Sequence, residues 1–146
     1  MSAYSDLYIG DAKKHLSTMF DYAINTCGFD ADFFASLFAK SEVSKQFAQG
    51  NPFYVAGMSG FELAQNVVDE CYGKKELAEP VYYREKSAEY WAGWSLAQFQ
   101  WESGESFEDI FKAVPFSEMV SMYPLYHEMD IAHFNERMSE LLCIRR

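Results

Sequence analysis

Residues 90–101 read Tyr-Trp-Ala-Gly-Trp-Ser-Leu-Ala-Gln-Phe-Gln-Trp and contain all three tryptophans of the chain. Tyr90, Trp94 and Trp101 follow one another at steps of four and seven residues, about one and two turns of an α-helix, so their rings project from one side. Aromatic side chains at this spacing usually fill a core, but Trp and Tyr also anchor partner proteins. The segment therefore predicts a helix and leaves the role of its rings open.

The small residues of this segment favour a buried central helix. Ala92, Gly93 and Ala97 would let a second helix approach closely, and the large rings bury much area when they pack. We expect the helix to run from about Ser87 to Ser103, with Gly104 ending it.

Helix signals also dominate on both sides of this segment. Apolar residues recur at helical spacing from about Asp6 to Thr26, and Ser59 with Glu62 forms a capping box. Because strand signals are few, we expect an all-α, single-domain bundle over residues 1–146, with about seven to eight helices, several of them short. Further helix starts are expected at or behind Asp30, Ser41, Ser106, Pro115 and Pro124, the last running to about Cys143.

Three stretches interrupt this helical pattern. Residues 53–60 fit either a buried loop or a short strand, and residues 81–83 fit a short extended piece. Residues 73–80 form the most polar run. Because this run is short, it predicts a hinge inside one domain rather than a boundary between two.

Charge and composition limit the function classes. The 146 residues are 49% hydrophobic and 18% aromatic, which suits a domain with a real core, and the net charge is −10. Between Glu102 and Glu140 stand nine acidic and two basic residues. This acidity argues against direct nucleic-acid binding, which depends on Lys and Arg, and it favours docking onto a basic protein or mimicry of nucleic acid. A role in solubility alone remains the simpler alternative.

The cysteines and the hydropathy pattern predict a cytoplasmic location. Cys27, Cys71 and Cys143 are odd in number, far apart and in no metal-like pairing, as expected for thiols in a reducing compartment. No signal-peptide pattern is visible, and no apolar stretch approaches the ~18–20 residues of a membrane span. We therefore expect no membrane contact and no cofactor.

The densest polar cluster lies in the expected last helix. His127, Asp130, His133 and Glu136 recur every three residues, and neighbours three apart share a helical face. Metal binding, or acid–base catalysis by His127, Glu128, Asp130 and His133 in a pocket walled by the tryptophans, is therefore the alternative function. A strict spacing of three drifts off the face, and Glu-x-x-His does not occur, so no catalytic or metal-ligating residue is assigned.

Two further site types receive less support. The turn Gly57–Gly60 at a helix N-terminus could seat an anion, but no basic residue lies close in sequence. The segments Ser41–Gln49 and Ser59–Tyr72 resemble a helix-turn-helix pair, yet the connection is too long. The second segment also has acidic residues and no basic ones.

Two regions carry a family resemblance. The first is Phe47–Leu63, and the second joins Glu89–Trp101 with 106–110, 115–118, 122–123 and 126–130. Together they resemble an uncharacterised family of small proteins from gut-dwelling Firmicutes and their mobile elements, with a Tyr-Trp-Ala-Gly-Trp motif. Members tend to be encoded beside toxin-like genes, including ADP-ribosyltransferase-like ones. The resemblance implies an antitoxin-like or regulatory protein of a bacterial or phage conflict system.

We therefore expect a non-catalytic protein–protein interaction module whose partner is a protein with a basic surface, such as a toxin or nuclease. The oligomeric state is left open. The residues expected to bind the partner are those with acidic or tyrosine side chains in the last third of the chain, namely Glu118, Tyr123, Tyr126, Glu128 and Asp130.

Overall fold

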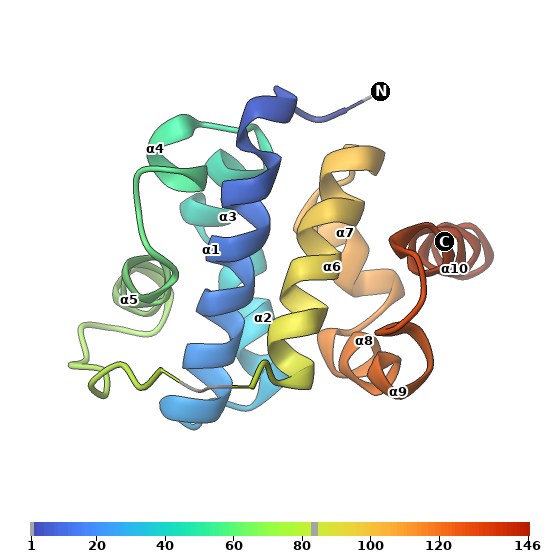
Figure 1. The fold of residues 1–146 in the computed structure, drawn as a ribbon. Coiled ribbons are helices and arrows are strands. Elements are labelled where there is room, and N and C mark those ends of the chain that lie inside the picture. Colours follow the sequence, from blue (N-terminus) through green and yellow to red (C-terminus); the bar gives the residue numbers. More distant parts are fainter. Residues whose placement is uncertain (1, 83–84) are drawn as a thin grey trace.

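The computed structural model describes residues 2–82 and 85–146, and within these ranges the chain forms ten α-helices and no strand. The all-α class is confirmed. The number of helices exceeds the expected seven to eight because α4 and α9 have only four residues each, while seven helices have seven or more. The helices in Figure 1 are α1 (Ile9–Asp21), α2 (Ala31–Lys40), α3 (Glu42–Ala48), α4 (Pro52–Val55), α5 (Gly60–Cys71), α6 (Ala88–Ser103), α7 (Phe107–Ala113), α8 (Phe116–Ser121), α9 (Tyr123–Tyr126) and α10 (Ile131–Arg145).

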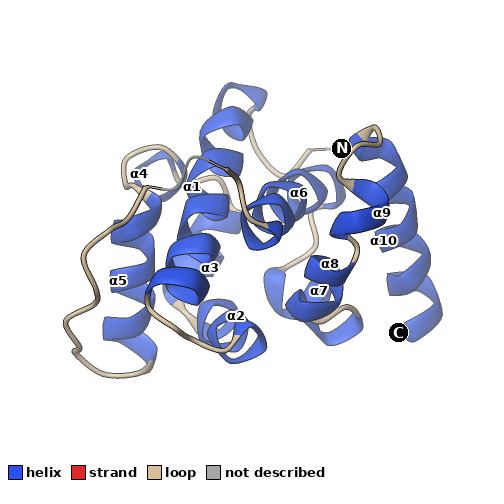
Figure 2. Cartoon of the chain, turned by 60° about the horizontal axis from the view of Figure 1, so that its bottom comes forward, coloured by secondary structure: helices blue, strands red, loops and turns tan. Residues whose placement is uncertain are grey.

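Helices α1 and α6 pack side by side at the centre of the molecule, with α5 beyond α1 and α10 beyond α6 (Figures 1 and 2). Gly93 makes this contact possible. A Cβ atom there would lie 2.7 Å from the Cα of Ser17, which is closer than atoms pack, and 3.0 Å from the carbonyl oxygen of Leu16, which is unusually tight. The close approach expected from the small residues of α6 is confirmed.

The expected stripe of Tyr90, Trp94 and Trp101 is not the most buried side of α6. Ala92, Leu96, Ala97 and Phe99 are buried, whereas Trp94 is 37% exposed and Tyr90 and Trp101 are half-buried. The prediction of a buried central helix is therefore correct, but residues outside the expected stripe form its buried side. Trp91, which stands outside the expected aromatic stripe, packs edge-on against α10.

An aromatic cluster joins the first helices to the last third of the chain. The ring of Phe20 in α1 stacks on Phe116 of α8 at 4.1 Å between centroids, and meets Phe34 and Phe38 of α2 edge-on at 5.7 Å each. All four rings are fully buried. Because Phe116 lies beyond residues 73–80, one hydrophobic core draws on both sides of the expected hinge.

The loop formed by residues 73–80 contains no helix and is tied to the body of the protein at two carbonyl groups. The side-chain amide of Gln65 donates to the carbonyl of Lys75 at 2.8 Å, and the Tyr22 hydroxyl donates to that of Ala78. Burial raises the pKa of the Tyr22 phenol above its ordinary value, so the hydroxyl keeps its proton as a donor. A hinge in this loop stays a prediction.

The expectation for residues 53–60 needs correction. Residues 53–55 belong to the short helix α4 and not to a strand. Asn51 caps this helix, since its side-chain oxygen accepts from the amide of Phe53 at 3.1 Å. Val81 and Tyr82 belong to neither a helix nor a strand. Tyr83 lies outside the described residues.

The last helix is also shorter than expected. The sequence predicted one helix from Pro124 to about Cys143, but α9 ends at Tyr126 and α10 begins only at Ile131. Asp130 caps α10, since its carboxylate accepts from the amide of Ala132 at 2.9 Å. An N-capping residue takes non-helical dihedral angles, which breaks the helix at this point.

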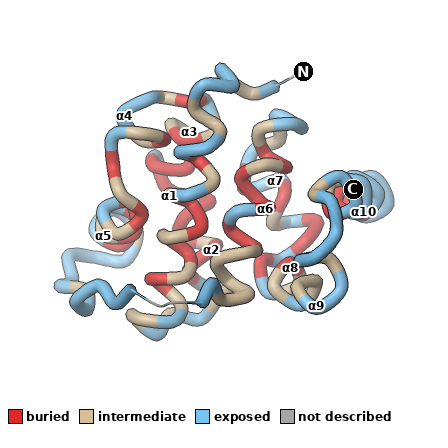
Figure 3. Tube along the Cα trace, viewed as in Figure 1, coloured by how far each residue is buried: buried red, intermediate tan, exposed pale blue. Residues whose placement is uncertain are grey.

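Helix α10 packs on α6 and α7 through one stripe and is otherwise exposed (Figure 3). The buried stripe consists of Phe134, Met138, Leu141 and Leu142. Within the described ranges, no helix combines the length and the hydropathy needed to cross a membrane.

Candidate functional site

An open groove of about 690 Å³ lies between α8 and α9 on one side and α10 on the other. Apolar side chains line part of it, and two of them are well exposed: Leu125 at 62% and Met129 at 44%. Met122 and Tyr126 extend this apolar lining. We call this surface the α8–α10 groove.

The rim of the groove is mostly acidic. Glu118 lies at the α8 side, and Glu136 and Glu140 lie at the α10 side. Arg137, which lies in the lining with His133, is paired with Glu140 at 3.1 Å. The groove therefore combines exposed apolar side chains with an excess of negative charge.

The structure brings two of the five expected partner-binding residues into this groove. Glu118 and Tyr126 line it, and Tyr126 is half-buried against the core rather than freely exposed. Tyr123, Glu128 and Asp130 lie in α9 and the turn that follows it, outside the lining.

The carboxylate of Glu118 is bound by another side chain of the protein. Both of its oxygens accept hydrogen bonds from the guanidinium of Arg145, at 2.8 and 3.0 Å, and Arg145 also donates to the carbonyl of Ala113 at 2.9 Å. The hydrogen bonds to Glu118 raise the pKa of the Arg145 guanidinium. This paired geometry ties α8 to the end of α10 and neutralises much of the charge of Glu118.

Tyr123 supports the fold rather than facing solvent. Its half-buried ring stacks on His127 at 4.1 Å between centroids and meets Trp91 edge-on at 5.8 Å. Of the five expected residues, Glu128 is the most clearly available, with a side chain 87% exposed and one weak contact, 3.6 Å, to Nε2 of His127. Asp130 is exposed, but its carboxylate caps α10.

The expected polar cluster does not share one helical face. The break at residues 127–130 separates His127 and Glu128 from His133, which lies in α10 and lines the groove. The ring of His127 is held by Tyr123, since Nδ1 donates to the carbonyl of that residue at 2.6 Å. In the part of the chain that the structure describes, no three His, Cys, Asp or Glu side chains are placed to hold a metal ion.

Sequence reasoning missed Leu125 and Met129, the two most exposed apolar residues of the groove. Their position near Pro124, in a run without a regular helical period, was the one feature of the sequence that could have indicated their exposure. An apolar residue in such a run reads as buried, because the sequence does not show which neighbours would cover it.

Comparison with known proteins identifies no relative of this chain. No family model matches the chain, and neither a curated protein nor a solved structure does so. The resemblance to the Firmicutes family therefore stays a prediction.

Proposed function

We propose that this protein is a non-catalytic protein-binding module, antitoxin-like or regulatory, and that its α8–α10 groove binds a basic amphipathic segment of the partner. The observation that carries the proposal is the exposure of Leu125 and Met129 in a groove with an acidic rim. Exposed apolar side chains surrounded by polar ones are typical of protein-binding surfaces.

The charge of this face supports a basic partner. Glu128 and Glu136 are exposed, and neither forms an ion pair with a Lys or Arg of the described residues. Around the groove stand five carboxylates and two guanidinium groups, so the face has a net negative potential. Lysine and arginine side chains of a partner would complement it, while the phosphates of a nucleic acid would be repelled. The residues counted are Glu118, Glu128, Asp130, Glu136, Glu140, Arg137 and Arg145.

The shape of the groove supports a helical partner segment. A groove between packed helices is the common receptor for an amphipathic helix, which inserts apolar residues spaced by three or four positions. Leu125, Met129 and Tyr126 would contact that apolar side, and the carboxylates would pair with basic residues at its edges. Methionine adapts to partners of different shape, because its side chain is unbranched and flexible.

The cellular setting of this proposal is the cytoplasm. All three cysteines are free thiols, which a reducing compartment maintains. The antitoxin-like part of the proposal rests on the resemblance of residues 47–63 and 89–130 to proteins encoded beside toxin-like genes.

The test is a pull-down between the purified chain and the product of the adjacent gene, followed by calorimetry. We expect a stoichiometric complex whose affinity falls as salt increases, because charge pairs across the interface are screened. The double substitution Leu125→Asp and Met129→Asp should weaken the complex at least ten-fold.

Phe53→Asp is the matched control, since Phe53 is 61% exposed but lies in α4, outside the groove. This variant should bind as the wild type does. Absence of any complex with the adjacent gene product would reject the antitoxin-like role, and equal weakening by the groove and control variants would reject the groove as the binding surface.

A further inference from the structure

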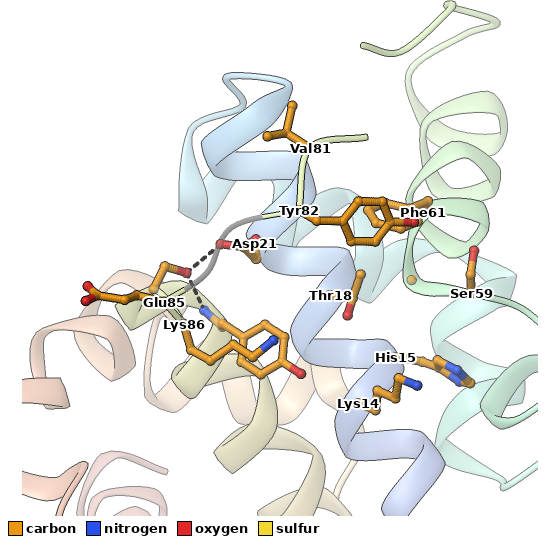
Figure 4. Close-up of a pocket in the computed structure, with 13 residues that line it drawn as sticks. Lys14, His15, Thr18, Asp21, Ser59, Phe61, Val81, Tyr82, Glu85 and Lys86 are labelled. Atoms are coloured by element: carbon orange, nitrogen blue, oxygen red, sulfur yellow. Dashed lines mark hydrogen bonds between the residues drawn. The ribbon is translucent and has the colours of Figure 1, made fainter. Parts of the chain in front are cut away.

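A second cavity, of about 340 Å³, lies on the α5 side of α1, away from the α8–α10 groove (Figure 4). Its described walls come from α1, the start of α5, residues 81–82, and residues 85–90 before and within α6. This volume falls at the lower end of the range of roughly 300–1,000 Å³ found for small-molecule sites. We call it the α1–α5 pocket.

Two lysines enter this pocket from different elements. Lys14 comes from α1, and Lys86 comes from the loop before α6 and lies over the ring of Tyr90, with Nζ 4.5 Å from the ring centroid. Neither ammonium group forms an ion pair with a carboxylate of the described residues. The pocket thus offers two unpaired positive charges in a strongly acidic protein, and these favour an anion.

The two carboxylates of the lining equal the lysines in number, so the direction of each group matters. Asp21 keeps its charge but is engaged in hydrogen bonds, since it accepts from the hydroxyl of Ser87 at 2.5 Å and from the side-chain amide of Asn25 at 2.9 Å. Glu85 extends its carboxylate outward, away from the other labelled side chains of the pocket (Figure 4). Both lysines line the cavity, while one carboxylate is bound to neighbouring side chains and the other is turned away.

Aromatic rings form the apolar walls. Phe61 and Tyr82 meet edge-on, at 5.5 Å between centroids and an interplanar angle of 85°, and Tyr90 lines the cavity beside Lys86. Aromatic walls favour planar ligands, because rings gain energy from stacked or edge-on contact.

The remaining polar groups of the pocket can form directional hydrogen bonds and contribute no charge. The hydroxyl of Ser59 already accepts from the amide of Glu62 in the capping box. Nδ1 of His15 donates to the carbonyl of Val55 at 2.8 Å, so Nε2 of the neutral ring is an acceptor. Lys14 and Lys86 are therefore the groups that would bind an anion.

We propose that the α1–α5 pocket binds a small aromatic anion, a planar ring carrying one carboxylate or phosphate group. The anionic group pairs with Lys14 and Lys86, and the ring contacts Phe61, Tyr82 and Tyr90. This site is independent of the α8–α10 groove, so each can be tested without the other.

The test is an NMR titration of the full chain with four probes. Benzoate and phenyl phosphate contain both parts of the expected ligand, while inorganic phosphate and benzyl alcohol contain one part each. The two aromatic anions should shift the amide signals of Lys14, Thr18 and Phe61, and should bind at least ten-fold more tightly than either single-part probe. If benzoate binds more tightly than phenyl phosphate, the anionic group of the ligand is a carboxylate, and in the opposite case it is a phosphate. Equal binding of all four probes, or shifts confined to other regions, would overturn the proposal.

Three variants separate charge from ring contact. The double substitution Lys14→Met and Lys86→Met should weaken both aromatic anions at least ten-fold. The control Lys45→Met with Lys112→Met removes the same charge from exposed positions outside the pocket and should have little effect. Tyr82→Ala should weaken phenyl phosphate but not inorganic phosphate, and because Tyr82 is 83% exposed, this change should leave the fold intact. Equal losses in the two lysine doubles, or unchanged binding of phenyl phosphate to Tyr82→Ala, would overturn the proposed contacts.

Discussion

The α8–α10 groove and the α1–α5 pocket differ in charge and in how the chain builds them. The α8–α10 groove has an acidic rim and comes from one stretch, residues 118–140. The α1–α5 pocket contains two lysines that form no ion pair with a described carboxylate, and it combines residues 14–21, 59–61, 81–82 and 85–90. The net charge of −10 belongs to the whole chain, whereas the sign of a local potential depends on which segments the fold brings together.

Helix α6 lies between these two regions, since it packs on α1 at one side and on α10 at the other (Figure 2). Substitutions in this part of the core therefore show whether the groove and the pocket form one cooperative unit. Substitutions at their surfaces show whether each recess acts by itself.

The largest expected effect is that of Phe134→Ala at the groove side. Phe134 is 1% exposed and packs edge-on against Trp91 at 5.4 Å, so its loss should lower the free energy of unfolding by about 3–5 kcal/mol. Chemical denaturation measures this loss. Hydrogen exchange should show it first in the amides of α10, and unchanged protection of α10 would contradict its attachment through this ring.

Gly93→Ala should have the next largest effect and act on both regions. The new methyl group would meet the backbone of Ser17, and such overpacking costs about 1–3 kcal/mol. Gly10→Ala is the control, because nothing lies within 4 Å of its Cβ position in α1, and it should stabilise the protein by about 0.5–1 kcal/mol. Denaturation of Gly93→Ala should remain one transition for signals from the groove and from the pocket. Two separate transitions would show that the regions unfold independently.

Asp130→Ala should destabilise the protein by about 1 kcal/mol, because it removes the cap of α10. Asp130→Asn retains a capping side chain without the charge, and should cost only a few tenths of a kcal/mol. Thermal unfolding of the two variants compares these costs. Equal losses would show that the charge, rather than the cap, is the contribution of this residue to stability.

The smallest effects on stability should come from Glu128→Gln at the groove side and Lys14→Gln in the pocket. Both residues are exposed, so each change should alter the free energy of unfolding by less than about 0.5 kcal/mol. Binding should respond differently: Glu128→Gln should weaken only the protein partner, and Lys14→Gln only the aromatic anions. Calorimetry with both ligands on both variants measures this, and a crossed effect would mean that the two recesses are coupled.

Local rules predicted the helix boundaries well. Ser41, Ser59 and Ser87 each cap the helix expected to begin there, and Gly104 ends α6 with a φ of 72°. A cap depends on atoms two or three residues away in the chain, so the sequence contains all the information needed. The same rule also explains the break at Asp130, where the capping residue was instead assigned to the interior of a longer helix.

The candidate sites were harder to predict than the helices. Glu118 and Tyr126, two of the residues expected to bind a partner, line the groove, and their binding role stays a prediction. The pairing of Glu118 with Arg145 joins residues 27 positions apart, which no local rule predicts. The exposure of Leu125 depends on which helices fail to cover it, and an apolar residue in sequence gives no sign of this.

The sequence by itself determined that this chain is helical, where most of its helices begin, and that its last third is acidic. These properties depend on composition and on interactions within one or two turns of helix. Only the tertiary structure decided which side of α6 is buried, and that Lys14 and Lys86 line the same cavity as Gly60. These three residues are far apart in sequence, and packing of α1, α5 and α6 brings them to one cavity. Such contacts join residues tens of positions apart, and only the packed core fixes them.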